Sequence, residues 1–249
     1  MTTLTRPPIA TTASTAGAEW IKLRSLRSTW WFVGGSVAVM LLVAMLGADD
    51  GDPSTVLAVP VAMAGLVNFV QYALGAFAML VVTGEFATRS ITVTFACTPS
   101  RTRVMLAKTL VAGGTVLLVG TGIAALGVGV AAARFGELGA LDGTHILDVL
   151  AMGLYLTMIA GLALGIGTVV RRTAGGLAIL ILLLLVVPEI LRLLSARFAA
   201  PVLETIAQYT PAPAGARLMA GEWEYGLVLA AWATAAIAAG VWALRTRDA

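Results

Sequence analysis

The chain has 249 residues, of which 59% are hydrophobic and only 12% charged, and its net charge is +3. Soluble domains carry roughly 25% charged residues, so this chain has too few to cover a globular surface in water. A soluble globular protein, a disordered chain and a coiled coil are thereby excluded, which leaves a polytopic membrane protein. The small net charge implies no strong attraction to nucleic acid, and no nucleic-acid partner is expected.

Six stretches of the chain are apolar enough to cross a bilayer, which takes about 20 residues of helix. The predicted fold class is therefore an all-α integral membrane protein with six transmembrane helices. We expect one transmembrane domain over 19–249, preceded by a flexible N-terminus over 1–18. The spans are expected at about 30–48, 60–83, 109–133, 149–170, 173–191 and 225–244.

The basic residues are distributed unevenly between the two sides that these spans define. If the N-terminus is inside, only Arg134, Arg192, Arg197 and Arg217 lie outside, and the other twelve of the 16 basic residues lie inside. Basic residues concentrate in cytoplasmic loops, so both termini are predicted to be cytoplasmic. The 14 Arg against 2 Lys, with abundant Ala and Gly, are typical of a GC-rich bacterial genome and so favour a bacterial cytoplasmic membrane.

The sequence shows no catalytic signature. GxxxxGK[ST], GxSxG and HExxH are all absent, and the single histidine, His145, excludes any site that needs two. Asp142, His145 and Asp148 are three residues apart, but we expect them to be solvated residues at a helix start and predict no metal site. The chain is therefore not expected to be an enzyme.

Two segments are neither spans nor short loops. Residues 85–108, predicted inside, include Ile91, Val93 and Phe95 at alternate positions, which taken alone indicates a strand. Residues 192–224, predicted outside, carry apolar residues at near-helical spacing. There we expect a short helix at the outer surface, broken at Pro211.

Polar residues inside a span are costly and call for a reason. Asn68, Gln71 and Tyr72 fall within about one turn of the second span, where they either line a translocation path or form hydrogen bonds between helices of one subunit. Glu189 either faces the outer exit, as part of that path, or pairs with Arg192 one turn later. We expect the local pair.

Small residues spaced four apart let helices approach closely. The fourth span has Gly161 and Gly165 at this spacing, and the third has Gly120 with Ala124 and Gly127 with Ala131. We expect these to pack helices within one subunit rather than to form a dimer seam.

Three segments predicted to be cytoplasmic resemble a known family. They read EWIKLRSLRST at 19–29, TGEFATRSITVT at 83–94 and PSRTRVMLAK at 99–108. Together with the six-span layout, they resemble the permease subunits of ABC-2-type exporters, especially short actinobacterial ones encoded beside a separate ATPase.

The resemblance implies an architecture and a set of partners. It implies a separate ABC ATPase subunit that holds ATP and Mg, with no cofactor in this chain, and a second permease that is either a copy of this chain or a sister chain. An interfacial helix against membrane lipids would precede the first span, and a re-entrant segment would lie outside between the fifth and sixth. The residues of the interfacial helix would be Trp20, Lys22, Arg24 and Arg27.

The resemblance also implies a cytoplasmic coupling helix between the second and third spans, which would dock on the ATPase. We therefore expect helix rather than strand here, starting close to Glu85 once Gly84 lets the chain turn. The coupling residues would be Glu85, Phe86, Arg89, Ser90 and Ile91.

The expected function is that of a membrane permease subunit of an ATP-driven exporter, forming half of the translocation path. An ion-driven secondary transporter is the first alternative, but it would need an ionisable residue at mid-membrane, and Glu189 lies near one end of its span. A non-transporting scaffold or regulatory protein is the second. The sequence selects no substrate.

The predicted topology places Cys97 in the cytoplasm, and it is the chain's one cysteine. An impermeant thiol reagent should therefore leave Cys97 unmodified in intact cells and label it after the membrane is opened. Labelling of Cys97 in intact cells would contradict the topology.

Overall fold

The structure, a computed structural model, describes residues 12–47, 57–97, 100–141 and 143–246. Over these ranges every regular element is a helix, and six helices are long and apolar enough to cross a membrane. The chain is therefore a multi-pass membrane protein with the six spans that the sequence predicts. The spanning helices are Arg27–Leu46, Ala58–Ala87, Arg101–Phe135, His145–Val170, Thr173–Phe198 and Tyr225–Thr246.

Several spans are composites of shorter elements. The first is α2 (Arg27–Leu46), preceded by α1 (Thr12–Ser25), and the second joins α3 (Ala58–Gly65), a π-helical turn η1 (Leu66–Val70) and α4 (Gln71–Ala87). Next come α5 (Ile91–Cys97), α6 (Arg101–Phe135), the 3-10 turn η2 (Leu138–Ala140) and α7 (Gly143–Val170). The fifth span joins α8 (Thr173–Ile181), a π-helical turn η3 (Leu182–Val186) and α9 (Val187–Phe198). The chain closes with α10 (Pro201–Gln208), α11 (Pro211–Met219) and α12 (Tyr225–Thr246).

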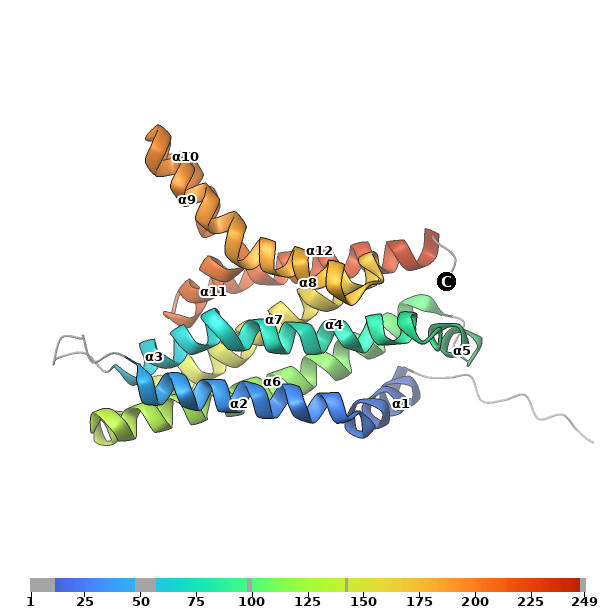
Figure 1. Ribbon diagram of the computed structural model, residues 1–249, viewed down its shortest axis with the longest axis horizontal. Helices are drawn as coiled ribbons and strands as arrows, with labels where there is room; N and C mark the ends of the chain where they lie inside the picture. The colour runs from blue at the N-terminus through green and yellow to red at the C-terminus, as the bar shows by residue number, and fades with distance from the viewer. Residues whose placement is uncertain (1–11, 48–56, 98–99, 142, 247–249) are drawn as a thin grey trace, which may run out of the picture.

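The spans run side by side along the long axis of the molecule, except that the second half of the fifth span, α9, bends away from the bundle (Figure 1). Helices α1 and α5 lie at one end of this bundle, together with the C-terminal end of α12, and we call this the α1 end. The other end, where α3 begins, is the α3 end. Helix α6 has 35 residues, which at 1.5 Å per residue is about 52 Å, so it extends beyond a hydrocarbon layer of about 30 Å.

Three sequence predictions need correction. Residues 12–18, expected to be flexible, form the first half of α1. The short helix after the second span begins at Ile91 and not near Glu85, because α4 runs through Gly84 to Ala87 and the chain turns only at Arg89, which has φ +57°. The segment beyond residue 192 has the expected break at Pro211, where α11 begins, but it is not one short helix before that point: α9 ends at Phe198 and α10 begins at Pro201.

Helix α7 is the centre of the bundle and packs against α4, α6 and α12. In the most apolar part of α7, 61% of the residues are buried, whereas in the most apolar part of the span that contains α8 and α9 only 17% are buried. Because other helices surround α7, apolar residues are favoured on all of its sides and not on one stripe alone. The spans at the edge of the bundle leave their outer faces to the membrane.

The small residues of α6 and α7 pack helices inside this subunit, as expected. Gly161 lies opposite Ala233 of α12, with 3.4 Å between an added Cβ and that methyl group, and Gly165 lies against the backbone of Ala236. On α6, Gly120 faces Leu156 of α7 and Gly127 faces Met40 of α2. The close approach of α7 and α12 therefore depends on glycine.

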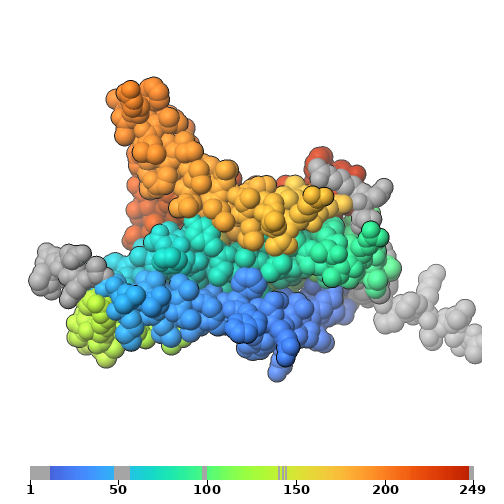
Figure 2. Space-filling model, viewed as in Figure 1, coloured from blue at the N-terminus to red at the C-terminus, as the bar shows by residue number. Residues whose placement is uncertain are grey.

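Helices α9 and α10 form an arm that stands away from the bundle at its α3 end (Figures 1 and 2). The two helices pack against each other, and the chain reverses at Ala199, whose φ is +49°. Apolar side chains on the arm remain exposed, among them Leu193, Phe198 and Val202 at 67–69%. The arm is therefore amphipathic, with an apolar surface that the described part of this chain does not cover.

Replacing Gly165 with Ala should destabilise the fold, since a Cβ there would overlap the Ala236 backbone, which cannot rotate away. We expect a loss of about 1–3 kcal/mol, typical of overpacking. Gly122→Ala is the matched control, because an added Cβ on this exposed face of α6 meets nothing within 4 Å. Thermal unfolding of both variants in one detergent measures the difference, and equal midpoints would contradict the packing role of Gly165.

Candidate functional site

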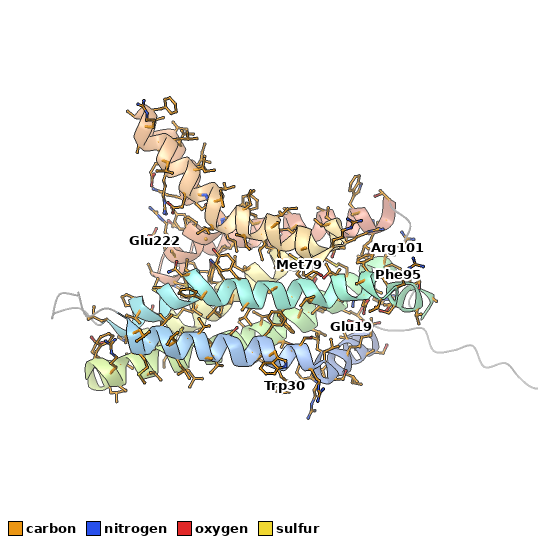
Figure 3. The ribbon with its side chains drawn as sticks, in the orientation of Figure 1. Glu19, Trp30, Met79, Phe95, Arg101 and Glu222 are labelled. Atoms are coloured by element: carbon orange, nitrogen blue, oxygen red, sulfur yellow. The ribbon has the colours of Figure 1, made fainter. Side chains whose placement is uncertain are left out.

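Four charged side chains from three helices meet at the α1 end of the bundle. Glu19 and Lys22 come from α1, Glu85 from the last turn of α4, and Lys108 from α6, seven residues after its start. Figure 3 shows Glu19 on α1, beside the end of the bundle that carries Arg101 and Phe95. We call these four residues the ionic ring.

The ring closes because each charge contacts two charges of opposite sign. The Lys108 ammonium lies 2.6 Å from a carboxylate oxygen of Glu19 and 2.8 Å from one of Glu85. The Lys22 ammonium lies 2.9 Å from an oxygen of each of the same two carboxylates. Two cations therefore alternate with two anions, and the ring is neutral.

Burial makes this pairing necessary. The side chains of Lys108 and Glu19 are 2% and 3% exposed, and that of Glu85 is 12% exposed. Removing a single charge from water costs several kcal/mol even after relaxation, and only well-placed counter-charges offset that cost. The docked α1 supplies Glu19, one of the two carboxylates that offset the cost of burying Lys108.

The lysines are notable because they are the only two in the chain, beside 14 arginines. A lysine ammonium is compact and has three donors that rotate together, so it can bridge two carboxylates in a small space. A planar guanidinium would need a larger cavity. Both lysines of this otherwise arginine-rich chain therefore lie in the ionic ring, where a compact ammonium group fits.

Lys22 is the solvent-facing member, with 45% of its side chain exposed. Burial lowers its pKa, but hydrogen bonds to Glu19 and Glu85 and the charges of both carboxylates outweigh that effect and raise the pKa above 10.5. A raised lysine pKa stabilises the fold fully below pH 10.5, and the contribution disappears as the pH rises through the shifted pKa. Lys22 therefore stays charged at physiological pH.

Helix α1 is held on the bundle by one face. Thr15, Glu19 and Leu23, spaced four apart, are buried, and the Thr29 hydroxyl donates to the Leu23 carbonyl at 2.9 Å. Leu26 is extended between the two helices, with φ −79° and ψ 120°. The ring and this corner together fix the direction in which α1 leaves α2.

Helix α5 sits next to the ring, and its residues divide between the core and solvent. Ile91 is 4% exposed and Phe95 is half-buried beneath the Arg101 guanidinium, whereas Val93 is 64% exposed. The alternating apolar residues that taken alone suggest a strand therefore lie on a short helix, one face of which packs on the bundle. A helix in place of a strand is what the family resemblance implies.

The five predicted coupling residues are brought together but face different ways. Glu85 belongs to the ionic ring, Phe86 stacks under the Arg171 guanidinium at 5.0 Å, and Ile91 is buried. Arg89 and Ser90 are exposed in the turn between α4 and α5. The first three hold the segment in place, while the last two present it to solvent.

A groove of about 790 Å³ opens between α1, α4 and α5. Leu23, Leu80 and Val93 are among its apolar lining residues, and Glu19, Lys22 and Glu85 of the ring border it. A cavity of this size and mixed lining is within the range of binding pockets. The α1 end therefore combines a rigid charged support, an exposed short helix and a groove beside it.

The predicted interfacial residues lie on α1 and at the start of α2, and three of the four are exposed without an ion pair to a described residue. Trp20 is 48% exposed, and Arg24 and Arg27 are also exposed. Lys22 instead turns to the two carboxylates of the ring.

The predicted translocation-path residues do not form one site, because Glu189 lies on α9, away from the other three on the second span. Asn68 is exposed and donates to the Ala64 carbonyl of its own helix at 2.9 Å, and Tyr72 is half-buried. Glu189 forms the expected local pair with Arg192 at 2.9 Å, on an exposed surface. A role for these residues in a translocation path stays a prediction.

Gln71 differs from them because it is buried and accepts a hydrogen bond from the Tyr155 hydroxyl of α7. It follows directly after the π-helical turn η1, and it also donates to the Val67 carbonyl. Tyr155 is fully buried, and a Cβ on Gly215 of α11 would overlap its ring. Gln71 and Tyr155 thus form a buried hydrogen bond between α4 and α7. Hydrogen bonding between helices of one subunit is one of the two roles that the sequence suggests for Gln71.

Three important residues have no assigned role in the predictions from sequence: Glu19 and Lys108 in the ring, and Tyr155 opposite Gln71. One signal for the ring is visible in the sequence, because the chain has only two lysines and both are predicted to lie on the side that has few acidic residues. Tyr155 lies in an otherwise apolar span and has no such signal.

Comparison with known proteins gives no family. No protein-family model matches the chain, and no curated protein is significantly similar to it. Its function therefore has to be inferred from the chain itself.

A double-mutant cycle tests the ring. Lys108→Met should destabilise the protein by about 3–5 kcal/mol, because two buried carboxylates then share one half-exposed lysine. Adding Glu19→Gln restores neutrality and leaves the Lys22–Glu85 pair, so the double variant should recover part of the loss. Lys22→Gln, at the solvent-facing position, is the milder control.

The measurement compares the unfolding midpoints, in one detergent, of the unaltered chain, Lys108→Met, Glu19→Gln, their double variant and Lys22→Gln. If the double variant loses as much stability as the two single changes added together, the charges do not act as a ring.

Proposed function

We propose that this chain is the permease subunit of an ATP-driven ABC-2-type exporter, and that it works with a separate ATPase subunit. The observation that supports this best is the arrangement at the α1 end. There α5 presents an exposed face next to a groove, and its other face rests on buried residues of the bundle. A contact that transmits movement must be firmly supported, and the last turn of α4, which leads into α5, is held on two sides.

The anchoring connects α5 to four spans. The ionic ring joins the last turn of α4 to α1 and α6. On another side of that turn, Phe86 stacks with Arg171, and the Arg171 guanidinium donates to the Ala243 carbonyl of α12 at 3.5 Å. A push on α5 would therefore reach α4, α6, α7 and α12 together.

We further propose that the α1 end is cytoplasmic. Most basic residues gather there, including the exposed Arg24, Arg27 and Arg89, and the positive-inside rule favours this orientation. The ATPase would then meet α5 and the groove on the side where ATP is present. The arm and α11 would lie outside, where they would close the exit.

The dimer belongs to the same proposal. A bundle of six spans would supply half of a path, and a second permease, either a copy or a sister chain, would supply the rest. The mostly exposed α2 and the span with α8 and α9, which are 22% and 17% buried, offer sides on which a second bundle can pack.

An ion-driven transporter is the second candidate because Lys108, Glu19 and Glu85 are buried ionisable groups, a feature of proton-coupled proteins. Their positions favour a structural role. The ring lies near the end of the bundle, and each of its charges already has two partners. The ring is neutral and so has no excess negative charge for a transported cation, although Oε2 of Glu85 is buried without a hydrogen-bond partner among the described residues.

The test uses two exposed residues of the proposed contact, because Phe86→Asp would also break the stack with Arg171. Arg89→Glu combined with Val93→Asp should leave the fold intact and lower recovery of the ATPase by about tenfold or more, equivalent to about 1.4 kcal/mol. The measurement is co-purification with an ABC ATPase encoded beside this chain's gene, together with ATP-dependent transport in vesicles.

The matched control is Arg197→Glu with Val202→Asp on the arm, which exchanges the same residue types at exposed positions of the α3 end. It should leave ATPase recovery unchanged. Full recovery with the α5 variant would show that α5 is not the coupling helix. Failure of the unaltered chain to retain any ATPase would contradict the proposed function itself.

A further inference from the structure

The corner between α1 and α2 is an exposed surface with an unusual composition. It comprises Trp20 and Arg24 from the end of α1, and Arg27, Trp30 and Trp31 from the start of α2. The three tryptophans are half of the six in the chain. We call these five residues the Trp-Arg corner.

The tryptophans are exposed despite their size. Trp20, Trp30 and Trp31 are 48%, 64% and 82% exposed. Figure 3 shows Trp30 at the outer edge of α2, away from the neighbouring span α4. Indole rings are enriched where lipid tails meet headgroups, because the ring is apolar and its N–H is a donor. The corner thus has the aromatic character of a membrane interface.

The arginines give the corner its charge. Arg24 and Arg27 are exposed, and neither forms an ion pair with any residue that the structure describes. The carboxylates nearby on α1 and α4, Glu19 and Glu85, are already engaged by the two lysines of the ionic ring. Among the described residues, no carboxylate therefore compensates the positive charge of the corner.

The ring also decides which way the corner faces. Because Thr15, Glu19 and Leu23 dock one face of α1 on the bundle, Trp20 and Arg24 project from the rest of the helix. The extended Leu26 then turns the chain into α2, so that Arg27 and the two following tryptophans lie at the start of a span. All five residues therefore lie beside the start of the first spanning helix.

We propose that the Trp-Arg corner binds the headgroups of anionic phospholipids in the leaflet at the α1 end. Two guanidinium groups match phosphate oxygens, with which they form paired, charge-assisted hydrogen bonds. Uncompensated charge selects anionic over zwitterionic lipids, and the tryptophans hold the corner at headgroup depth. An acidic protein surface would also match the arginines, but the position of the indole rings beside the start of a spanning helix favours lipid headgroups. This inference does not depend on transport.

The experiment compares lipids directly. The detergent-purified full chain is titrated with phosphatidylglycerol or with phosphatidylcholine of the same acyl chains, and bound lipid is counted by native mass spectrometry. The unaltered protein should prefer phosphatidylglycerol, and Arg24→Gln with Arg27→Gln should reduce that preference by about tenfold or more, since a basic residue at a membrane surface contributes about one kcal/mol.

Two further variants separate charge from packing. Arg24→Lys with Arg27→Lys keeps the charge and should retain most of the preference. Arg192→Gln with Arg197→Gln removes two exposed arginines near the α3 end and should leave the preference intact. Equal unfolding midpoints of all variants in neutral detergent show that the corner still folds.

Each remaining outcome contradicts the proposal. An unaltered chain that binds both lipids equally has no anionic site. A glutamine variant that keeps the full preference places the site elsewhere. A glutamine variant that keeps the lipid preference but loses co-purification with the ATPase assigns the corner to a protein partner instead.

Discussion

A buried lysine at the end of a helical bundle is the constraint on which the α1 end depends. The side chain of Lys108 is 2% exposed, and two carboxylates lie 2.6 and 2.8 Å from its ammonium to offset the cost of burial. One of them, Glu19, precedes it by 89 residues, and the other, Glu85, by 23. The position of α1 is therefore tied electrostatically to α4 and α6, and not only by the hydrophobic contacts of a surface helix.

The same last turn of α4 carries a second support. Glu85 enters the ring, and the next residue, Phe86, stacks under Arg171, which follows α7 and has φ +60°. A non-glycine residue in this conformation costs about 1–2 kcal/mol, so the surrounding contacts must hold it. The last turn of α4 is thus held by an ion pair and by a stacked ring, and α5 packs against this end of the bundle through the buried Ile91. That support is what a coupling contact or a membrane anchor would require.

The interior of the bundle is organised differently, with close packing in place of charge. Gly165 lets α7 touch the backbone of α12, and Gln71 and Tyr155 join α4 to α7 by a sealed hydrogen bond. Such contacts satisfy polar groups between helices without exposing them to lipid. The rigid centre contrasts with the two edges, where α2 and the fifth span leave apolar surface for the membrane or another subunit.

The amino-acid sequence determined the features that depend on local composition. Span number and order follow from the length of apolar runs, helical packing by Gly161 and Gly165 follows from their spacing, and the Glu189–Arg192 pair follows from one helical turn. Only the tertiary structure decided the rest. The ring joins residues from three segments, and Tyr155 meets Gln71 across 84 positions, so neither has a local pattern. Likewise, Gly84 does not end its helix, because the two residues after it are held by tertiary contacts, Glu85 by Lys108 and Phe86 by Arg171, and these outweigh glycine's weak preference for a turn.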